Sequence, residues 1–400
     1  MKKLLYLVLI FIANPFHAVG SEIINEPDKF AWQLFIELNL PAAPNKRGVA
    51  DSSKKLGDEG NVVWETWALA DDVFTRDGCK PSRWDDLKLR YSTKSERMRS
   101  PVSKADLIFS QLNEDDFQVN FDPNEPFSET RMNQAAFDFI RNEGLYNIEG
   151  QEAFHTSGRF IDLPEEAREI KSAWRVLTKE EIKSGRYHMN KAGGETYGLI
   201  ALHIITKDIP QWFWSTFEHV DNPDIDIRDT ENDLRWFDRH TNGGEKSRLP
   251  KEVIGTKWEN YRLKGTQLDF VTLDGRPTIV ANAIIERGFM GSSSCVSCHA
   301  HATIGDPINR CDPTKDKSCK AEDIRANRLP IFEDIRRQYL DPTNPKSKSS
   351  RFILGWTGTP NPELFYDKNA GALISETRSY TQTDFMWSFF RAKSKHLCNK

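Results

Sequence analysis

The run Cys295-Val-Ser-Cys298-His299 constrains this 400-residue chain more than any other feature. Two cysteines three positions apart lie on one side of a single helical turn, where each thiol can add to one vinyl group of a haem. The histidine that follows can then offer a ring nitrogen to the iron as its proximal ligand. The pattern therefore predicts one covalent haem c, attached at Cys295 and Cys298 and ligated by His299.

Two other kinds of site also use a Cys-x-x-Cys pair, namely zinc sites and thioredoxin-like redox motifs. A structural zinc site needs a second pair of ligands with suitable spacing, and the chain has no second cysteine pair of that kind. A thioredoxin-like pair follows a strand and opens a longer helix, whereas this pair follows Gly291-Ser-Ser-Ser. Both alternatives are therefore weaker than haem attachment.

The first 20 residues have the pattern of a secretory signal peptide, with a basic start, an apolar run at 4–13 and small residues before the cleavage position. We expect cleavage near Gly20 and Ser21. The apolar run is shorter than the roughly 20 residues that a membrane-spanning helix needs, and no other stretch approaches that length. These features predict a periplasmic protein whose mature chain has no membrane span.

Charge and length bear on the partners. The formal net charge of −4 argues against nucleic acid, whose binding needs a basic face. The chain is much longer than a lone haem carrier requires, so most of it is not needed to hold the cofactor. This excess favours a role beyond carriage, with a redox partner protein or a small-molecule substrate.

The chain has six cysteines, and the haem motif uses two of them. Cys79, Cys311, Cys319 and Cys398 remain, an even number that suits disulfides in an oxidising compartment. Cys311 and Cys319 bracket a polar, turn-rich loop, so we predict a disulfide between them and a second one between Cys79 and Cys398. The second pair would link the C-terminus to the N-terminal half.

Hydrophobic patterning predicts an α+β chain, with an antiparallel or mixed sheet in the middle and helical N-terminal and C-terminal parts that carry the cytochrome c-type haem motif. The predicted domains are a signal peptide at 1–20, an α+β region at 21–280 and a haem-binding region at 281–400. The predicted helices are 29–39, 137–146 and 321–340. The predicted strands are 170–177, 197–206 and 211–220, with a hairpin made by 268–273 and 277–280. Residues 75–128 are expected to form an insertion with short helices.

The sixth iron ligand has three candidates. Met386 lies downstream of His299, as the methionine ligand of a small cytochrome c does, although a buried methionine also fills core space. A hairpin that turns near Pro210 could bring His203 and His219 together in a cavity over the haem, or leave them as core histidines. The third possibility is an open coordination position.

Several stretches together resemble a family of exported bacterial mono-haem cytochrome c-like proteins, mostly of unassigned activity. The stretches are Phe35-Ile-Glu-Leu-Asn-Leu-Pro41, Trp64-Glu-Thr-Trp67, Ser172-Ala-Trp-Arg-Val-Leu177, Leu202-His-Ile, Trp214-Ser-Thr-Phe-Glu-His-Val-Asp-Asn222 and Ser294-Cys-Val-Ser-Cys-His299. The resemblance spans most of the chain beyond residue 20. It implies one haem and an exported protein, and it implies no substrate.

The sequence thus predicts a periplasmic mono-haem c-type cytochrome that transfers electrons. A haem enzyme of oxidase or peroxidase type, with an open distal side, is the first alternative, because the chain is so long. A sensor or interaction module that contains haem is the second. No nucleophile elbow, P-loop or dinucleotide-binding glycine motif appears, so hydrolase, kinase and nicotinamide-dependent functions have no support.

Overall fold

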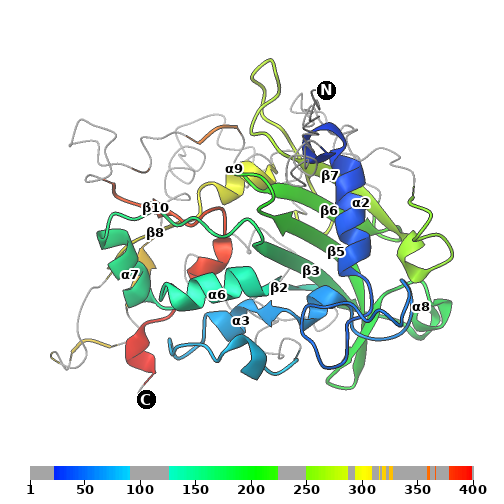
Figure 1. The fold of residues 1–400 in the computed structure, drawn as a ribbon, viewed down its shortest axis with the longest axis horizontal. Coiled ribbons are helices and arrows are strands. Elements are labelled where there is room, and N and C mark those ends of the chain that lie inside the picture. The colour runs from blue at the N-terminus through cyan, green and yellow to red at the C-terminus, as the bar shows by residue number, and fades with distance from the viewer. Residues whose placement is uncertain are drawn as a thin grey trace, which may run out of the picture.

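A computed structural model describes most of the chain, and Figure 1 draws its fold. The described residues are 22–90, 126–223, 249–286, 293–308, 315, 318–320, 324–327, 358–360, 365 and 378–398. Strands and helices pack into an α+β arrangement, which confirms the predicted class. The predicted signal peptide lies outside the described residues. Within the described part, no helix combines the length and the apolar character that crossing a membrane requires.

The main sheet has seven strands, all paired antiparallel, in the order β1-β2-β3-β5-β6-β7, with β4 paired to β5. Its strands are β1 (Ala68–Leu69), β2 (Phe127–Met132), β3 (Arg168–Val176), β4 (Met189–Ala192), β5 (Glu195–Thr206), β6 (Phe213–His219) and β7 (Tyr261–Gln267). A second sheet of three strands has the order β10-β8-β9, with β8 (Thr303–Ile308), β9 (Arg325–Asn327) and β10 (Thr381–Gln382). The sequence predicted β3, β5 and β6 correctly, within a few residues at each end.

The α-helices of the described part lie around the main sheet, and several short 3-10 turns connect them (Figure 1). The α-helices are α2 (Pro27–Leu38), α3 (Ala70–Val73), α6 (Gln134–Asn142), α7 (Ile148–Thr156), α8 (Lys179–Ser184) and α9 (Cys295–His299). The 3-10 turns are η1 (Val63–Thr66), η2 (Trp84–Asp86), η4 (Lys257–Asn260), η10 (Trp387–Arg391) and η11 (Lys395–Leu397). The predicted helix at 29–39 is confirmed as α2, and the one at 137–146 overlaps α6, which begins three residues and ends four residues earlier.

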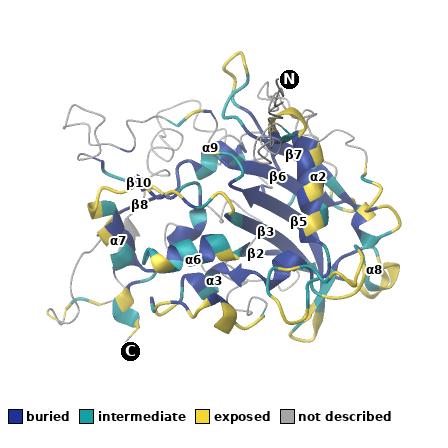
Figure 2. Cartoon of the chain, in the orientation of Figure 1, coloured by how far each residue is buried: buried dark blue, intermediate teal, exposed yellow. Residues whose placement is uncertain are grey.

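Helix α2 covers one face of the main sheet (Figure 1). Its apolar side chains repeat with helical spacing and so form one buried stripe. Pro27 in its first turn suits the start of a helix. The ring of Phe30 packs edge-on against Phe213 of β6, and Phe35 packs against Phe217, four residues further along the same strand. Figure 2 shows the buried strands behind α2 and the exposed outer side of the helix. We call this side of the sheet the α2 face.

The opposite side of the main sheet carries α9 and the segment 384–388, and we call it the α9 face. Because side chains alternate along a strand, β6 directs Trp214 and Thr216 to the α9 face and Phe213 and Phe217 to the α2 face. The apolar core is continuous through the sheet, since Val296 of α9 belongs to the same buried cluster as Phe35. Core packing therefore includes described residues from both 21–280 and 281–400.

Three predicted elements differ from the structure. Around Asp274-Gly275 the chain makes a turn with one isolated bridge, Val271 to Pro277, and no hairpin of two strands forms there. The neighbouring strand is β7 instead, which ends just before this turn. Leu273, inside the predicted strand, is 81% exposed in this turn and packs against no core.

The predicted helix at 321–340 is wrong at its start, since residues 325–327 form β9 and pair with β8. Residues 328–340 lie outside the described part of the chain. The predicted insertion at 75–128 also ends inside a strand, because β2 begins at Phe127. The polar residues Glu129 and Arg131 interrupt the apolar pattern of β2, so the pattern did not predict a strand. Both are buried, because they form an ion pair with each other.

Candidate functional site

The Cys-x-x-Cys-His run forms the one-turn helix α9, as its spacing requires. Ser294 caps the helix, and its side chain accepts a hydrogen bond from the Ser297 backbone N–H. The side chains of Cys295 and Cys298 are free thiols of intermediate exposure. The motif thus presents two unpaired thiols from one side of a helical turn, which is the arrangement that two thioether bonds need.

The amide of Gln267, at the end of β7, fixes the start of α9 against the sheet. Its Oε1 accepts a hydrogen bond of 3.1 Å from the Val296 N–H, and its Nε2 donates to the Ser294 Oγ at 2.8 Å. The same Nε2 donates to the Thr278 Oγ1 at 2.5 Å. Since Gln267 is fully buried, these bonds set the position of α9 relative to β7.

His299 is held by a bond from its Nδ1 to the Phe385 carbonyl oxygen, at 2.7 Å. A carbonyl oxygen can only accept, so Nδ1 carries the proton and the lone pair of Nε2 is free to bind a metal. No described residue forms a hydrogen bond with Nε2. Burial lowers the pKa of His299 to about 3, which keeps the ring neutral at physiological pH. This is the tautomer and the charge that an iron ligand requires.

Aromatic rings surround the His299 imidazole. Its centroid lies 4.5 Å from that of Trp214 on β6 and 6.3 Å from that of Trp387. Burial raises the pKa of the Cys298 thiol to about 12, and it raises that of Cys295 well above its ordinary value. The thiols of the bare chain are therefore neutral in a largely apolar surrounding, which also suits the hydrophobic ring of a haem.

Three charged or titratable side chains from other elements lie beside the motif on the α9 face: Lys171 of β3, His203 of β5 and Glu286. Lys171 interacts electrostatically with the Cys298 sulfur and with His299, and Glu286 interacts with both cysteines. The His203 Nε2 lies 3.5 Å from the Glu286 Oε2. The structure thus places His203 near the haem motif, and its role in a haem cavity stays a prediction.

His219 does not join this group, and the predicted approach of His203 and His219 is wrong. The β5–β6 hairpin does form, but its register pairs His203 with Thr216 and directs the two histidines to opposite faces of the sheet. His219 stacks on Tyr187, with the ring centroids 3.8 Å apart. Burial lowers the pKa of His219 to about 4, so it is a neutral core histidine on the α2 face.

Met386 lies next to Phe385 and is 1% exposed, as part of the apolar core. Its neighbour Phe385 supplies the carbonyl that binds the His299 Nδ1. The structure therefore gives Met386 a core role, and its part as an iron ligand stays a prediction.

The remaining candidates are cysteines. The predicted disulfide Cys79–Cys398 is confirmed, with the two Cα atoms 4.9 Å apart. Cys319 is also disulfide-bonded, and its predicted partner Cys311 lies outside the described residues. With Cys79 and Cys398 paired, the cysteines of the haem motif are left available for another bond.

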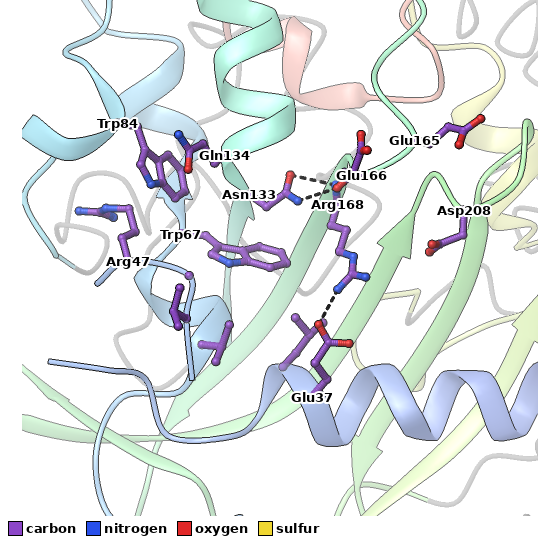
Figure 3. Close-up of a pocket in the computed structure, with 14 residues that line it drawn as sticks. Glu37, Arg47, Trp67, Trp84, Asn133, Gln134, Glu165, Glu166, Arg168 and Asp208 are labelled. Atoms are coloured by element: carbon purple, nitrogen blue, oxygen red, sulfur yellow. Dashed lines mark hydrogen bonds and ion pairs between the residues drawn. The ribbon is translucent and has the colours of Figure 1, made fainter. Parts of the chain in front are cut away.

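A pocket of about 570 Å³ lies elsewhere, between the end of α2, the start of β3 and the loop before β1 (Figure 3). Trp67 forms one wall, and Arg168 crosses the pocket to pair with Glu37 at 3.0 Å. None of the residues that line this pocket belongs to the haem motif or its neighbours. We therefore base the functional assignment on α9, where the reactive side chains are.

No family model, no curated protein and no solved structure matches the chain. Among the described residues, no three or more His, Cys, Asp and Glu side chains gather in a way that could hold a metal ion.

The sequence patterns do not predict Lys171, Glu286, Trp214 or the Phe385 carbonyl as parts of this site. Lys171 left one usable signal, since a lysine inside the strand run Ile170-Lys-Ser-Ala-Trp174 is unusual in a buried sheet. The other three carry no such signal. Every residue has a backbone carbonyl, so the sequence does not distinguish the one of Phe385. A tryptophan such as Trp214 fits an apolar core equally well.

Proposed function

We propose that this protein is a mono-haem c-type cytochrome that transfers electrons in the periplasm. The observation that carries the proposal is the state of α9: two unpaired thiols on one turn, followed by a histidine whose Nδ1 is bonded to a backbone carbonyl. This is the complete set of groups that covalent haem attachment and proximal ligation require.

When bound, a haem c supplies a one-electron couple whose potential its surroundings adjust. In this chain, Cys295 and Cys298 would hold the haem, and His299 would bind its iron through Nε2. The Phe385 carbonyl keeps the imidazole in one orientation and makes its Nε2 more basic. Trp214 and Trp387 flank the ring and limit the access of water.

Two features support a periplasmic location. The signal-peptide pattern at 1–20 predicts export, and covalent haem attachment of this kind needs an exported chain. The disulfide Cys79–Cys398 fits an oxidising environment, because such bonds are rare in the cytosol. A redox protein of that compartment, or a small-molecule substrate, is then the partner that exchanges the electron.

The test is intact mass spectrometry of the protein produced in cells with the haem c attachment machinery. We expect the mass of the processed chain plus one haem in the wild type. Cys295→Ala together with Cys298→Ala should abolish attachment, because no thioether can then form.

The matched control is Cys79→Ala together with Cys398→Ala, which removes two cysteines far along the chain and should keep the haem. A wild-type protein that accumulates without haem under these conditions would overturn the proposal. Loss of haem in the control alone would assign the attachment to the wrong cysteines.

A second candidate function is a haem enzyme, and the polar group Lys171, His203 and Glu286 beside the motif favours it. An enzyme needs an open iron position where a substrate binds, whereas a carrier fills both axial positions. Rapid binding of carbon monoxide to the reduced wild-type protein would support the enzyme, and slow binding would support the carrier.

A further inference from the structure

The turn that supplies the Phe385 carbonyl has an unusual backbone. Asp384 and Phe385 have φ angles of +50° and +67°, in the left-handed region that residues with side chains seldom occupy. A hydrogen bond of 3.1 Å from the Met386 N–H to the Thr383 carbonyl closes the turn around them. Two successive left-handed residues are the pattern of a type I′ turn, in which glycine, asparagine and aspartate are the usual residues. A phenylalanine holds this conformation only at an energetic cost.

This backbone conformation determines where the Phe385 carbonyl points. The carbonyl oxygen accepts a hydrogen bond of 2.7 Å from the His299 Nδ1. On the other side of the turn, the Thr383 N–H donates to the Ala302 carbonyl at 2.9 Å, just beyond α9. Because the peptide unit is planar, the backbone angles of Asp384 and Phe385 fix the direction of the carbonyl. Relaxation of either residue to a negative φ would therefore move the carbonyl away from His299.

The carboxylate of Asp384 accepts hydrogen bonds from three other segments. Its Oδ1 accepts a bond of 3.1 Å from the indole Nε1–H of Trp212. Its Oδ2 accepts a bond of 2.7 Å from the Leu163 N–H and another from the Lys207 ammonium. The Asp384 side chain is 9% exposed, so water replaces these donors poorly. A strained backbone persists only where its surroundings hold it in several ways, and these three bonds do so.

Two of the three donors come from the connection between β5 and β6. Lys207 directly follows β5, and Trp212 directly precedes β6. Trp212 is fully buried and has a φ of +63°, so it is a second left-handed residue that contacts Asp384. Two positions further along, the ring of Trp214 lies 4.5 Å from that of His299, measured between centroids. The same stretch of chain therefore contacts both the imidazole and the turn that binds it.

We propose that Asp384 is a positioning residue for the iron ligand. By holding the turn in its left-handed form, it keeps the Phe385 carbonyl on the His299 Nδ1 and thereby lowers the reduction potential of the haem. The inference rests on the proposed haem attachment and extends it. A carbonyl acceptor on Nδ1 makes Nε2 a stronger electron donor, which stabilises ferric iron more than ferrous iron. Loss of the bond should therefore raise the potential.

The test compares wild-type, Asp384→Ala and Asp384→Glu proteins, each first shown by mass to contain one haem. Two quantities are measured: the reduction potential, and the rate at which the His299 Nδ1 proton exchanges with solvent, followed by nuclear magnetic resonance. In both variants the potential should rise by the equivalent of about a tenfold change in the ratio of reduced to oxidised protein, which is about 59 mV for one electron. Proton exchange should become at least about tenfold faster, because the bond to the carbonyl opens more often.

Asp384→Glu separates position from charge. Loss of a negative charge raises the potential of a nearby haem by itself, whereas glutamate keeps the charge and displaces the carboxylate by one methylene group. If Asp384 acted only through its charge, Asp384→Glu would keep the wild-type potential and exchange rate, and the proposal would be overturned. The matched control is Asp162→Asn, which removes the other carboxylate that contacts Lys207, an exposed one outside the turn. It should leave both quantities unchanged.

Trp212→Phe tests the same turn without any change of charge, and without a substitution at position 384 that could prevent folding. It removes one donor to Asp384, so the potential and the exchange rate should rise, each by less than in Asp384→Ala. Trp258→Phe is its control, since Trp258 is equally buried, packs against Phe35 on the α2 face and has an Nε1 with no hydrogen-bond partner among the described residues.

Trp258→Phe should leave both quantities unchanged, although it also removes buried ring atoms. Equal effects of the two tryptophan variants would assign the change to lost packing and overturn the role of Asp384. A wild-type chain without haem would instead refute the proposed function, and mass spectrometry detects that outcome separately.

Discussion

Gln267 shows how single residues of the sheet position the haem motif. Its amide uses both ends, accepting from the Val296 N–H and donating to the Ser294 and Thr278 side chains. Because the residue is fully buried, no water can replace these partners. The orientation of α9 therefore depends on one side chain of β7.

Gln267→Leu should lower the free energy of unfolding by about 1–3 kcal/mol, because it leaves buried donors and acceptors without partners. Denaturant unfolding of the haem-loaded protein measures this loss. Gln382→Leu is the matched control, since Gln382 donates to the Ala300 carbonyl at the other end of α9 but is exposed. Water can replace that bond, so we expect a change below about 0.5 kcal/mol. Equal losses in the two variants would contradict this account.

At the scale of elements, the two faces of β6 have different roles. Its alternate residues Trp214 and Thr216 face α9, whereas Phe213, Phe217 and His219 face α2. A shift of one residue in the β5–β6 register would exchange these sets. The aromatic contacts with α2 fix the register, and they thereby decide which histidine lies near the haem motif.

Helix α8 adds a pH-dependent contribution at the far end of β3. Glu181 closes a capping box with Thr178, and its carboxylate makes a double ion pair with Arg175, at 2.5 and 3.0 Å. The hydrogen bonds from Arg175 lower the pKa of Glu181 from 4.5 to about 2. Since the pKa is lower in the folded state, the ionised carboxylate stabilises the fold above about pH 4.5. This stabilisation is lost as the pH falls toward 2.

Glu181→Gln should therefore lower the free energy of unfolding by about 1–2 kcal/mol at pH 7, a value reduced for the partial exposure of the pair. The difference from the wild type should shrink steadily between pH 4.5 and 2. Unfolding curves across this range measure it. Glu180→Gln changes the same charge at an exposed position of the same turn and serves as the control. A difference that stays constant with pH would refute the role of the ion pair.

At the scale of the whole molecule, the C-terminal segment ties distant parts together. Cys398 is bonded to Cys79, Arg391 pairs with Asp71 at 2.8 Å, and the Phe389 carbonyl accepts a bond from Gln151 of α7. The same segment supplies the Phe385 carbonyl that orients His299. The N-terminal half therefore holds in place the C-terminal segment whose Phe385 carbonyl orients His299, the proposed iron ligand.

Removal of the disulfide by Cys79→Ala with Cys398→Ala should lower the free energy of unfolding by about 3–5 kcal/mol, because the bond closes a loop with a sequence separation of 319. The haem should remain attached, since its bonds to cysteine are thioethers. Unfolding with and without reductant gives the energy, and peptide mapping without reduction gives the pairing. A linked peptide of Cys319 with Cys79 or Cys398 would contradict the structure's Cys79–Cys398 bond.

Sequence alone determined the local features of this protein. The spacing of Cys295, Cys298 and His299 predicts one side of a helical turn, and α9 is such a turn. Period-2 patterns predicted β3, β5 and β6, and period-3.6 patterns predicted α2 and α6. These inferences succeed because they depend only on residues a few positions apart.

Tertiary structure alone decided what surrounds the motif. The separation of His203 from His219, the bond from His299 to Phe385 and the position of Lys171 all depend on strand register and on segments far apart in the chain. The strand β2 was missed for a related reason, since its buried charges are balanced by each other and by distant groups. The bond from Arg131 to the Glu65 carbonyl joins residues 66 positions apart, and the bond from His299 to the Phe385 carbonyl joins residues 86 positions apart. Local patterns carry no information about such contacts.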